Sequence, residues 1–225
     1  MKFTAAALSM LLVLGSCGTS QKTGTAAGAG AGAALGALVG GLLNNSHRGT
    51  GAVVGAAIGA AVGGTAGNLI GKHMDKVKAE AEAVKNAQVS TVTDANGLTA
   101  VKVTFDSGIL FQTNKYALNA SAKNDLAQFA QVLKNNADCE AIQGYTDATG
   151  NDGINLPLSQ NRANSVSDYL KSCGVTSSQI KSVEGLGSAN PVVNTTAACA
   201  QNRRVEVYMY ASQAMVNAAN NGTLK

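Results

Sequence analysis

Histidine and clustered positive charge are scarce in this 225-residue sequence. The two histidines, His47 and His73, both precede residue 90, so the part of the chain that follows has no histidine for acid–base catalysis. His73 has no second histidine, cysteine or acidic cluster beside it, and no metal or cofactor site is expected. The 17 Lys and Arg residues are scattered, which argues against the basic stripe of a nucleic-acid-binding protein. A net charge of +4 remains compatible with weak attraction to an anionic polymer.

Glycine and alanine crowd the first third of the chain, whereas most aromatic and β-branched residues follow residue 89. A chain of this length has room for one well-packed domain plus accessory segments. We therefore expect the folded core mainly in the second half.

The N-terminus has the features of an export signal. Lys2 precedes an apolar run at residues 3–14, which is too short to span a bilayer. The following Leu-Gly-Ser-Cys string, ending at Cys17, resembles the lipobox of bacterial lipoproteins, which implies a signal peptide at 1–16 and lipidation of Cys17. An ordinary signal peptide with a chance cysteine is the alternative. The residue after this cysteine is Gly18 rather than Asp, which resembles lipoproteins that are sorted to the outer membrane.

Residues 24–71 contain a glycine at every fourth position, interrupted once by a polar stretch at 44–50. The repeating glycines are Gly24, Gly28, Gly32, Gly36, Gly40, Gly51, Gly55, Gly59, Gly63, Gly67 and Gly71. A step of four keeps them on one helical face, where they permit close helix packing. Each half is about 20 residues, or roughly 30 Å as a helix, which is long enough to cross a hydrocarbon core.

This repeat resembles the glycine-zipper modules of bacterial envelope proteins, which implies a close-packed helical hairpin over residues 24–71. Insertion of the hairpin into a membrane is a further expectation. A flexible Gly/Ala linker is the alternative, but it does not explain the regular spacing or the absence of charge within each half.

The remaining boundaries follow from composition. Residues 17–23 are expected to be a lipidated tether, and the charged, alanine-rich residues 72–90 a solvated helical spacer. A globular domain is expected at 91–212, followed by a tail at 213–225.

Within this domain, hydrophobic periodicity predicts alternating strands and helices. Period-two patterns and short apolar runs predict strands at 99–105, 139–145, 180–186 and 205–209, and helical spacing predicts helices at 121–135 and 160–172. Strands that alternate with helices predict an open α/β sandwich with its helices on one face.

Ser159 and Arg162 stand where the second helix is expected to start. A Ser before an apolar helix is a good N-cap, but the third residue after it is Arg rather than the favoured Glu or Gln. A cation near a helix N-terminus is locally unfavourable, which indicates a visiting anion that Arg162 could hold with two parallel hydrogen bonds. A surface arginine paired with a nearby acid is the alternative.

Three segments decide between these interpretations. They are Gly144–Val166, with its Thr-Asp, Gly, Asn, Leu-Ser and Arg-Ala, then Asn202-Arg203-Arg204-Val205, and Leu110-Phe111-Gln112-Thr113-Asn114. Together they resemble the motifs of the OmpA C-terminal-domain family, and the resemblance covers about residues 99–210. It implies an α+β fold of βαβαββ order, an open sandwich with a mixed sheet and helices on one face.

The resemblance also implies a ligand site for peptidoglycan. Asp147 is expected to bind the ammonium, and Arg162 the carboxylate, of diaminopimelate in the stem peptide. Asn155, Asn114 and Thr146 match ligand-contacting positions, and Arg203 is expected at the rim. Two residues depart from the family pattern: Tyr145 replaces a His, with an expected effect on packing beneath the site, and Gln112 replaces a rim Asp.

The cysteines that follow Cys17 are Cys139, Cys173 and Cys199. Cys139 begins a predicted strand and Cys173 ends the helix that returns from the top of that strand, so both are expected at the same end of the sheet. We predict a Cys139–Cys173 disulfide worth about 3–4 kcal/mol. Cys199 then stays free or pairs between chains.

The expected function is that of an outer-membrane lipoprotein, anchored by lipid at Cys17, whose periplasmic domain binds peptidoglycan and tethers the membrane to the wall. Homo-oligomerisation is left open. An envelope protein or surface antigen in which wall binding is only an anchor is the alternative. An enzyme is disfavoured because the domain has no histidine and no Ser or Cys nucleophile beside a recognisable base. Asp147 and Asp152 could form an acid pair, but the Gly, Asn and Thr residues around them fit ligand binding better. An ion-driven stator is disfavoured because the zipper halves contain no ionisable residue.

Overall fold

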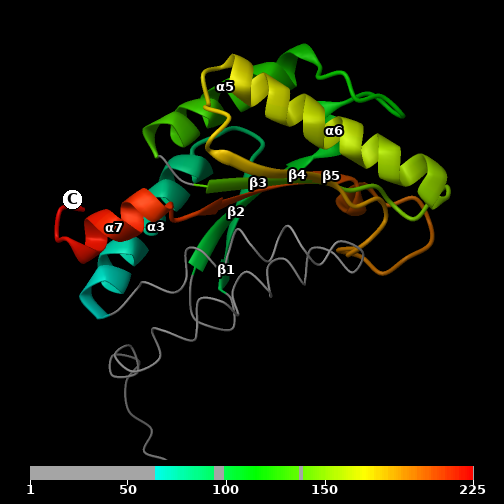
Figure 1. Cartoon of the computed structure of the whole chain (residues 1–225). Helices are drawn as coiled ribbons and strands as arrows, with labels where there is room; N and C mark the ends of the chain where they lie inside the picture. Colours follow the sequence, from blue (N-terminus) through cyan, green and yellow to red (C-terminus); the bar gives the residue numbers. More distant parts are fainter. Residues whose placement is uncertain (1–63, 94–98, 137–138, 225) are drawn as a thin grey trace, which may run out of the picture.

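The computed structural model describes residues 64–93, 99–136 and 139–224 (Figure 1). The expected signal peptide, the lipidation site Cys17 and most of the glycine repeat lie outside these ranges. No helix within the described residues is long and apolar enough to cross a membrane.

A five-stranded mixed sheet forms the centre of the domain, in the order β1-β2-β5-β3-β4. Neighbouring strands are antiparallel except β3 and β4, which are parallel. The strands are β1 Gln88–Thr93, β2 Thr99–Asp106, β3 Cys139–Gly144, β4 Ile180–Gly185 and β5 Arg204–Tyr210. The helices are α3 Gly64–Glu82, α4 Ser107–Leu110, α5 Ala120–Asn135, α6 Asp152–Ser172 and α7 Gln213–Asn220.

The predicted fold class is confirmed. The elements β2, α5, β3, α6, β4 and β5 follow one another in the expected βαβαββ order, and α5 and α6 lie on one face of the sheet (Figure 1). Phe105 of β2 meets Phe129 of α5 edge to face, with 5.5 Å between ring centroids, and both rings are fully buried. Burial of such a ring stabilises the fold by about 1.5–3 kcal/mol.

Helix α3 is more than the solvated spacer expected from composition. Every third or fourth residue from Ala66 to Ala81 is buried in the same core as the strands, including Ile70, Met74 and Val77. The helix packs against β1, β2 and α5. The expected tail also differs, because α7 packs against α3 and buries Val216. Residues at both ends of the predicted domain therefore complete its core.

Helix α6 begins eight residues earlier than predicted, at Asp152. Its N-cap is Asn151, whose carbonyl accepts from Ile154 and Asn155. The predicted N-cap, Ser159, lies inside the helix, so the prediction of a capping site at Ser159 is wrong. Pro157 lies inside α6 beyond its first turn, where it cannot donate a backbone hydrogen bond, and the helix continues through it.

Two glycines set the close approach of α6 to the sheet. A Cβ atom on Gly144 of β3 would overlap the carbonyl oxygen of Ser159, and one on Gly185 of β4 would overlap the backbone of Gln160. Glycine at these positions lets the helix backbone lie almost directly on the strands. This contact fixes the height of Arg162 above the end of the sheet.

The cysteine prediction does not agree with the structure. Cys173 is a free thiol, so the predicted disulfide to Cys139 is not formed. Cys173 is the C-cap of α6 and is partly buried against the hydrophobic core. Cys199 is a buried free thiol, which agrees with the first of its two expected states, a free thiol or a disulfide between chains.

Candidate functional site

A pocket of about 480 Å³ opens where the sheet ends beneath the start of α6. Its walls come from the turn after β2, the loop after β3, the first turns of α6 and the segment before β5. The lining residues are Ser107, Gly108, Phe111, Gln112, Thr113, Asn114, Thr146, Asp147, Thr149, Gly150, Ile154, Asn155, Leu158, Arg162, Ala198 and Arg203. All six peptidoglycan-binding residues predicted from the sequence are among them.

Asp147 is buried, with 4% of its surface exposed, and both of its oxygens are occupied. Oδ1 accepts from the backbone N–H of Thr149 at 3.2 Å and from its hydroxyl. Oδ2 accepts from the backbone N–H of Cys199 at 3.3 Å and from Nη1 of Arg203 at 2.5 Å. Burial raises the pKa of Asp147, but the hydrogen bonds from Thr149, Arg203 and Cys199 outweigh it and leave the pKa below its ordinary value.

Arg162 is equally buried, with 4% exposed, and the charge of Asp147 acts on it without forming an ion pair. Its Nε donates to the carbonyl of Lys115 at 3.1 Å, and its guanidinium lies 5.3 Å from the ring centre of Phe111. No carboxylate of the described residues lies within ion-pair distance of Arg162, and its two terminal nitrogens make no hydrogen bond to those residues. Burial, followed by the nearby charge of Arg203, lowers the pKa of Arg162, yet an arginine remains protonated.

The loop between β3 and α6 is held in shape by Asn155. Its amide nitrogen donates to the carbonyls of Asp147 and Thr149, at 3.4 and 3.1 Å. Gly150 has a φ of +91°, which places it in the left-handed region that favours glycine. Asn155 therefore positions Asp147, in addition to lining the pocket as predicted.

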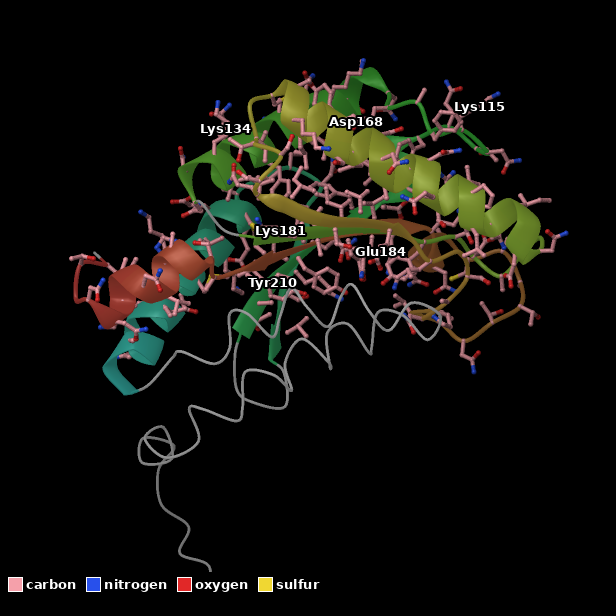
Figure 2. All side chains as sticks on the ribbon, in the orientation of Figure 1. Lys115, Lys134, Asp168, Lys181, Glu184 and Tyr210 are labelled. Carbon is pink, nitrogen blue, oxygen red and sulfur yellow. The ribbon has the colours of Figure 1, made fainter. Side chains whose placement is uncertain are left out.

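The opposite wall of the pocket is the loop that contains Asn114 and Gln112. Both residues are exposed, and Asn114 has a φ of +56°, a conformation that asparagine tolerates well. Lys115 extends its side chain to the surface while its carbonyl faces Arg162 (Figure 2). Gln112 lines the pocket as expected and brings no charge to it.

Arg203 was expected only to line the rim of the pocket, but it also pairs with Asp147. It lines the pocket, but its side chain, 38% exposed, is the counterion of Asp147. Arg203 directly precedes the central strand β5, so sequence spacing alone did not reveal the pair.

Tyr145 does not line the pocket. Its side chain is buried, its hydroxyl donates to Gln143 at 2.8 Å, and the guanidinium of Arg204 lies 3.8 Å from its ring centre. Arg204 also donates to Glu206 at 2.8 Å. These residues form a buried polar network on the far side of the sheet from α6, the side on which Glu184 lies (Figure 2). The replacement at Tyr145 thus acts on packing behind the site, as expected.

Two further findings concern residues outside the predicted set. Asp152 is exposed and is not among the lining residues, so Asp147 is the only acid among the residues that line the pocket, and the two do not share a catalytic pair. Ser107 was missed by sequence reasoning, although it lines the pocket and is 2% exposed. The alternation of Val101, Val103 and Phe105 already indicated that the next inward-facing position is 107.

Comparison with known families finds two matches on this chain. Residues 110–219 match the model of the OmpA family, and residues 1–75 match that of the YMGG-like Gly-zipper. The predicted resemblances are thus confirmed, and the first match contains every predicted binding residue.

Among curated proteins, the chain is 39% identical over 104 residues to Probable lipoprotein YiaD of Escherichia coli, which covers 45% of this chain and 47% of that protein. It is 48% identical over 85 residues to Peptidoglycan-binding protein ArfA of Mycobacterium tuberculosis, with 36% of this chain and 26% of that protein covered. Outer-membrane lipoprotein YfiB of Pseudomonas aeruginosa is 36% identical over 104 residues, with 45% and 61% covered. The chain therefore spans about half or less of the length of the first two relatives.

Solved structures share the fold. The cell wall anchor of the T6SS from Pseudomonas aeruginosa superposes with a TM-score of 0.51 at 23% identity, over 62% of this chain and 97% of that one. A MotB-like protein from Desulfovibrio vulgaris gives a TM-score of 0.54 at 21% identity, over 64% and 94%. At these identities the likeness establishes the fold alone.

Proposed function

Because residues 110–219 match the model of the OmpA family, we propose that this chain binds peptidoglycan non-covalently, through the diaminopimelate residue of the stem peptide. In this proposal the domain faces the periplasm and lipid at Cys17 holds the chain in the outer membrane. The protein then tethers that membrane to the cell wall. The relative named as a peptidoglycan-binding protein supports the ligand, and the relatives named as lipoproteins support the anchor.

The observation that carries the proposal is the buried Arg162, which forms no ion pair with an acid of the described residues. A buried charge is costly unless an opposite charge or several hydrogen bonds compensate it. Arginine offers a planar fork that matches a carboxylate with two parallel hydrogen bonds. A ligand carboxylate in the pocket supplies the missing partner.

The ammonium group of the ligand fits the wall of the pocket that contains Asp147. Asp147 is held ionised by its hydrogen bonds, and although its oxygens already accept from Thr149, Cys199 and Arg203, its negative charge can attract an ammonium group in the pocket. The free end of diaminopimelate carries an ammonium and a carboxylate on one carbon, which matches one fixed anion and one fixed cation.

The expected affinity for a single stem peptide is modest. Each charge-assisted hydrogen bond contributes about 1.5–3 kcal/mol, which gives dissociation constants in the micromolar to millimolar range. Firm attachment then comes from many ligands on one polymer and from the membrane anchor that keeps the domain close to it.

The glycine repeat is a separate part of the proposal. The match to the Gly-zipper model over residues 1–75 supports a helical hairpin over residues 24–71, a range that includes the first turns of α3. Insertion of the hairpin into a membrane and self-association are proposed with it.

Calorimetric titration with the tripeptide L-Ala–D-Glu–meso-diaminopimelate tests the ligand assignment. Wild type should bind it, and Arg162→Gln should weaken binding by at least ten-fold, because it removes a charged hydrogen-bonding fork. Lys171→Gln is the matched control, since it makes the same charge change on the exposed side of the same helix. Equal binding by the Arg162 and Lys171 variants, or no binding by wild type, contradicts the proposal.

A further inference from the structure

Ser107 presents a buried hydroxyl that has no hydrogen-bond partner among the described residues. The residue is 2% exposed and lines the pocket. Thr146, 4% exposed, also lines the pocket, and its hydroxyl is buried and lacks a partner in the described part of the chain. An unsatisfied buried hydroxyl is unfavourable, and proteins normally satisfy such groups with water or a ligand.

The two hydroxyls occupy equivalent places on either side of the central strand. Asp106 of β2 pairs with Arg204 of β5, and Gly144 of β3 pairs with Val205. If this register is continued toward the pocket, Ser107 and Thr146 flank Arg203. The backbone N–H of Ser107 donates to the carbonyl of Arg203 at 3.0 Å, which fixes this arrangement on one side.

The charge of the pocket decides what these hydroxyls can bind. Its charged lining residues are Arg162, Arg203 and Asp147. Asp147 already accepts four hydrogen bonds, which is about the capacity of a carboxylate. Within the described part of the chain, the terminal nitrogens of Arg162 remain as unused donors, so the charged side chains of the pocket offer free donors while their one carboxylate is already occupied. A hydroxyl in such a pocket is best satisfied by donating its proton to an anion.

We infer that Ser107 is a ligand-contacting residue, whose hydroxyl donates to the carboxylate held by Arg162. The site then selects an amino acid with a free carboxylate over the same amino acid as its amide. An amide offers one neutral oxygen to the donors and turns an N–H₂ group toward Arg162. This inference rests on the proposed function and adds to it a specificity-determining residue.

Titration of two ligands into wild type and Ser107→Ala tests the inference. The ligands are the tripeptide L-Ala–D-Glu–meso-diaminopimelate and the same peptide amidated at the free amino-acid end of diaminopimelate. Wild type should bind the free acid at least ten-fold more tightly than the amide. Ser107→Ala should bind the free acid about ten-fold more weakly than wild type, and the amide less than about three-fold more weakly.

Ser167→Ala is the matched control. Ser167 is 1% exposed, its hydroxyl also has no described partner, and it lies on α6 outside the pocket lining. This variant should bind both ligands like wild type, and thermal unfolding should show both serine variants folded.

The outcomes separate this inference from the proposed function. Absence of binding by wild type overturns the proposed function and the inference with it. Binding of the free acid by wild type that is unchanged in Ser107→Ala overturns the inference alone. The inference also fails if Ser107→Ala weakens the acid and the amide by the same factor.

Discussion

At the scale of single residues, the two charges of the site differ in how the protein satisfies them. Asp147 is fully hydrogen-bonded within the chain, through Thr149, Cys199 and Arg203. Arg162 is equally buried, but its terminal nitrogens donate to no atom of the residues that the structure describes. The carboxylate of Asp147 is therefore part of the hydrogen-bond network of the folded domain, whereas the terminal nitrogens of Arg162 are available to a ligand. Asp147 should accordingly contribute to stability as well as to binding.

The stabilising contribution of Asp147 should depend on pH. Its pKa is lower in the folded protein than in the unfolded chain, so folding favours the ionised form. The contribution is complete above the ordinary carboxyl pKa of about 3.9 and is lost as the pH falls through the lower folded value. Asp147→Asn should cost about 1–3 kcal/mol of unfolding free energy at pH 7, and this difference should shrink below about pH 4.

Urea unfolding of wild type and Asp147→Asn between pH 3 and pH 7 measures this difference. Asp168→Asn is the control, because Asp168 is exposed on α6, and its effect should stay small at every pH. A cost for Asp147→Asn that does not change with pH rules out a depressed pKa for Asp147.

At the scale of elements, the sequence predicted those whose hydrophobic pattern is simple. Strand β2 alternates strictly, and α5 places Leu126, Phe129 and Leu133 on one face, so both were found close to their observed bounds. Strand β1 was missed because its Ser- and Thr-rich sequence, at the edge of the sheet, resembles a polar loop. The buried face of α3 was missed because charged residues dominate its composition, although the spacing of Ile70, Met74 and Val77 was already helical.

The site was predictable where residues are close in sequence or carry a family motif. Arg162 lines the pocket and its role in binding stays a prediction, but the supporting argument from a helix N-terminus was wrong, since the residue lies well inside α6. The pairing of Arg203 with Asp147 and the unpartnered Ser107 depend on which strands are neighbours. That information is not contained in local spacing.

The close contact between α6 and β3 gives a prediction for Gly144. In Gly144→Ala the new methyl group overlaps the backbone of α6 at Ser159, and backbone cannot move aside as a flexible side chain can. Overpacking of this kind should cost about 1–3 kcal/mol of unfolding free energy and should also weaken ligand binding, because it shifts Arg162.

Gly71→Ala is the control for this substitution. Gly71 lies within α3, and an added Cβ there meets no atom within 4 Å. The replacement should stabilise the protein by about 0.5–1 kcal/mol, because alanine is the better helix former. Chemical denaturation of both variants gives the comparison, and a Gly144→Ala protein as stable as wild type contradicts the close packing.

At the scale of the whole molecule, the first described residues of α3 and the pocket lie at opposite ends of the domain. Helix α3, through which the N-terminal part enters the domain, lies with α7 at one end of the sheet, whereas the start of α6 and the segment before β5 lie at the other (Figure 1). Because α3 is packed into the core, it joins the N-terminal part firmly to the sheet. A load between a membrane anchor and the wall would then pass along the strands, which suits a tether.

Co-sedimentation of the mature chain with purified peptidoglycan sacculi tests the central claim most directly. Wild type and Lys171→Gln should pellet with the sacculi, while Arg162→Gln should remain largely in the supernatant, since the loss of the carboxylate-binding fork weakens every contact along the polymer. If Arg162→Gln pellets as completely as wild type, this pocket does not hold the wall, and the proposed function of the site is wrong.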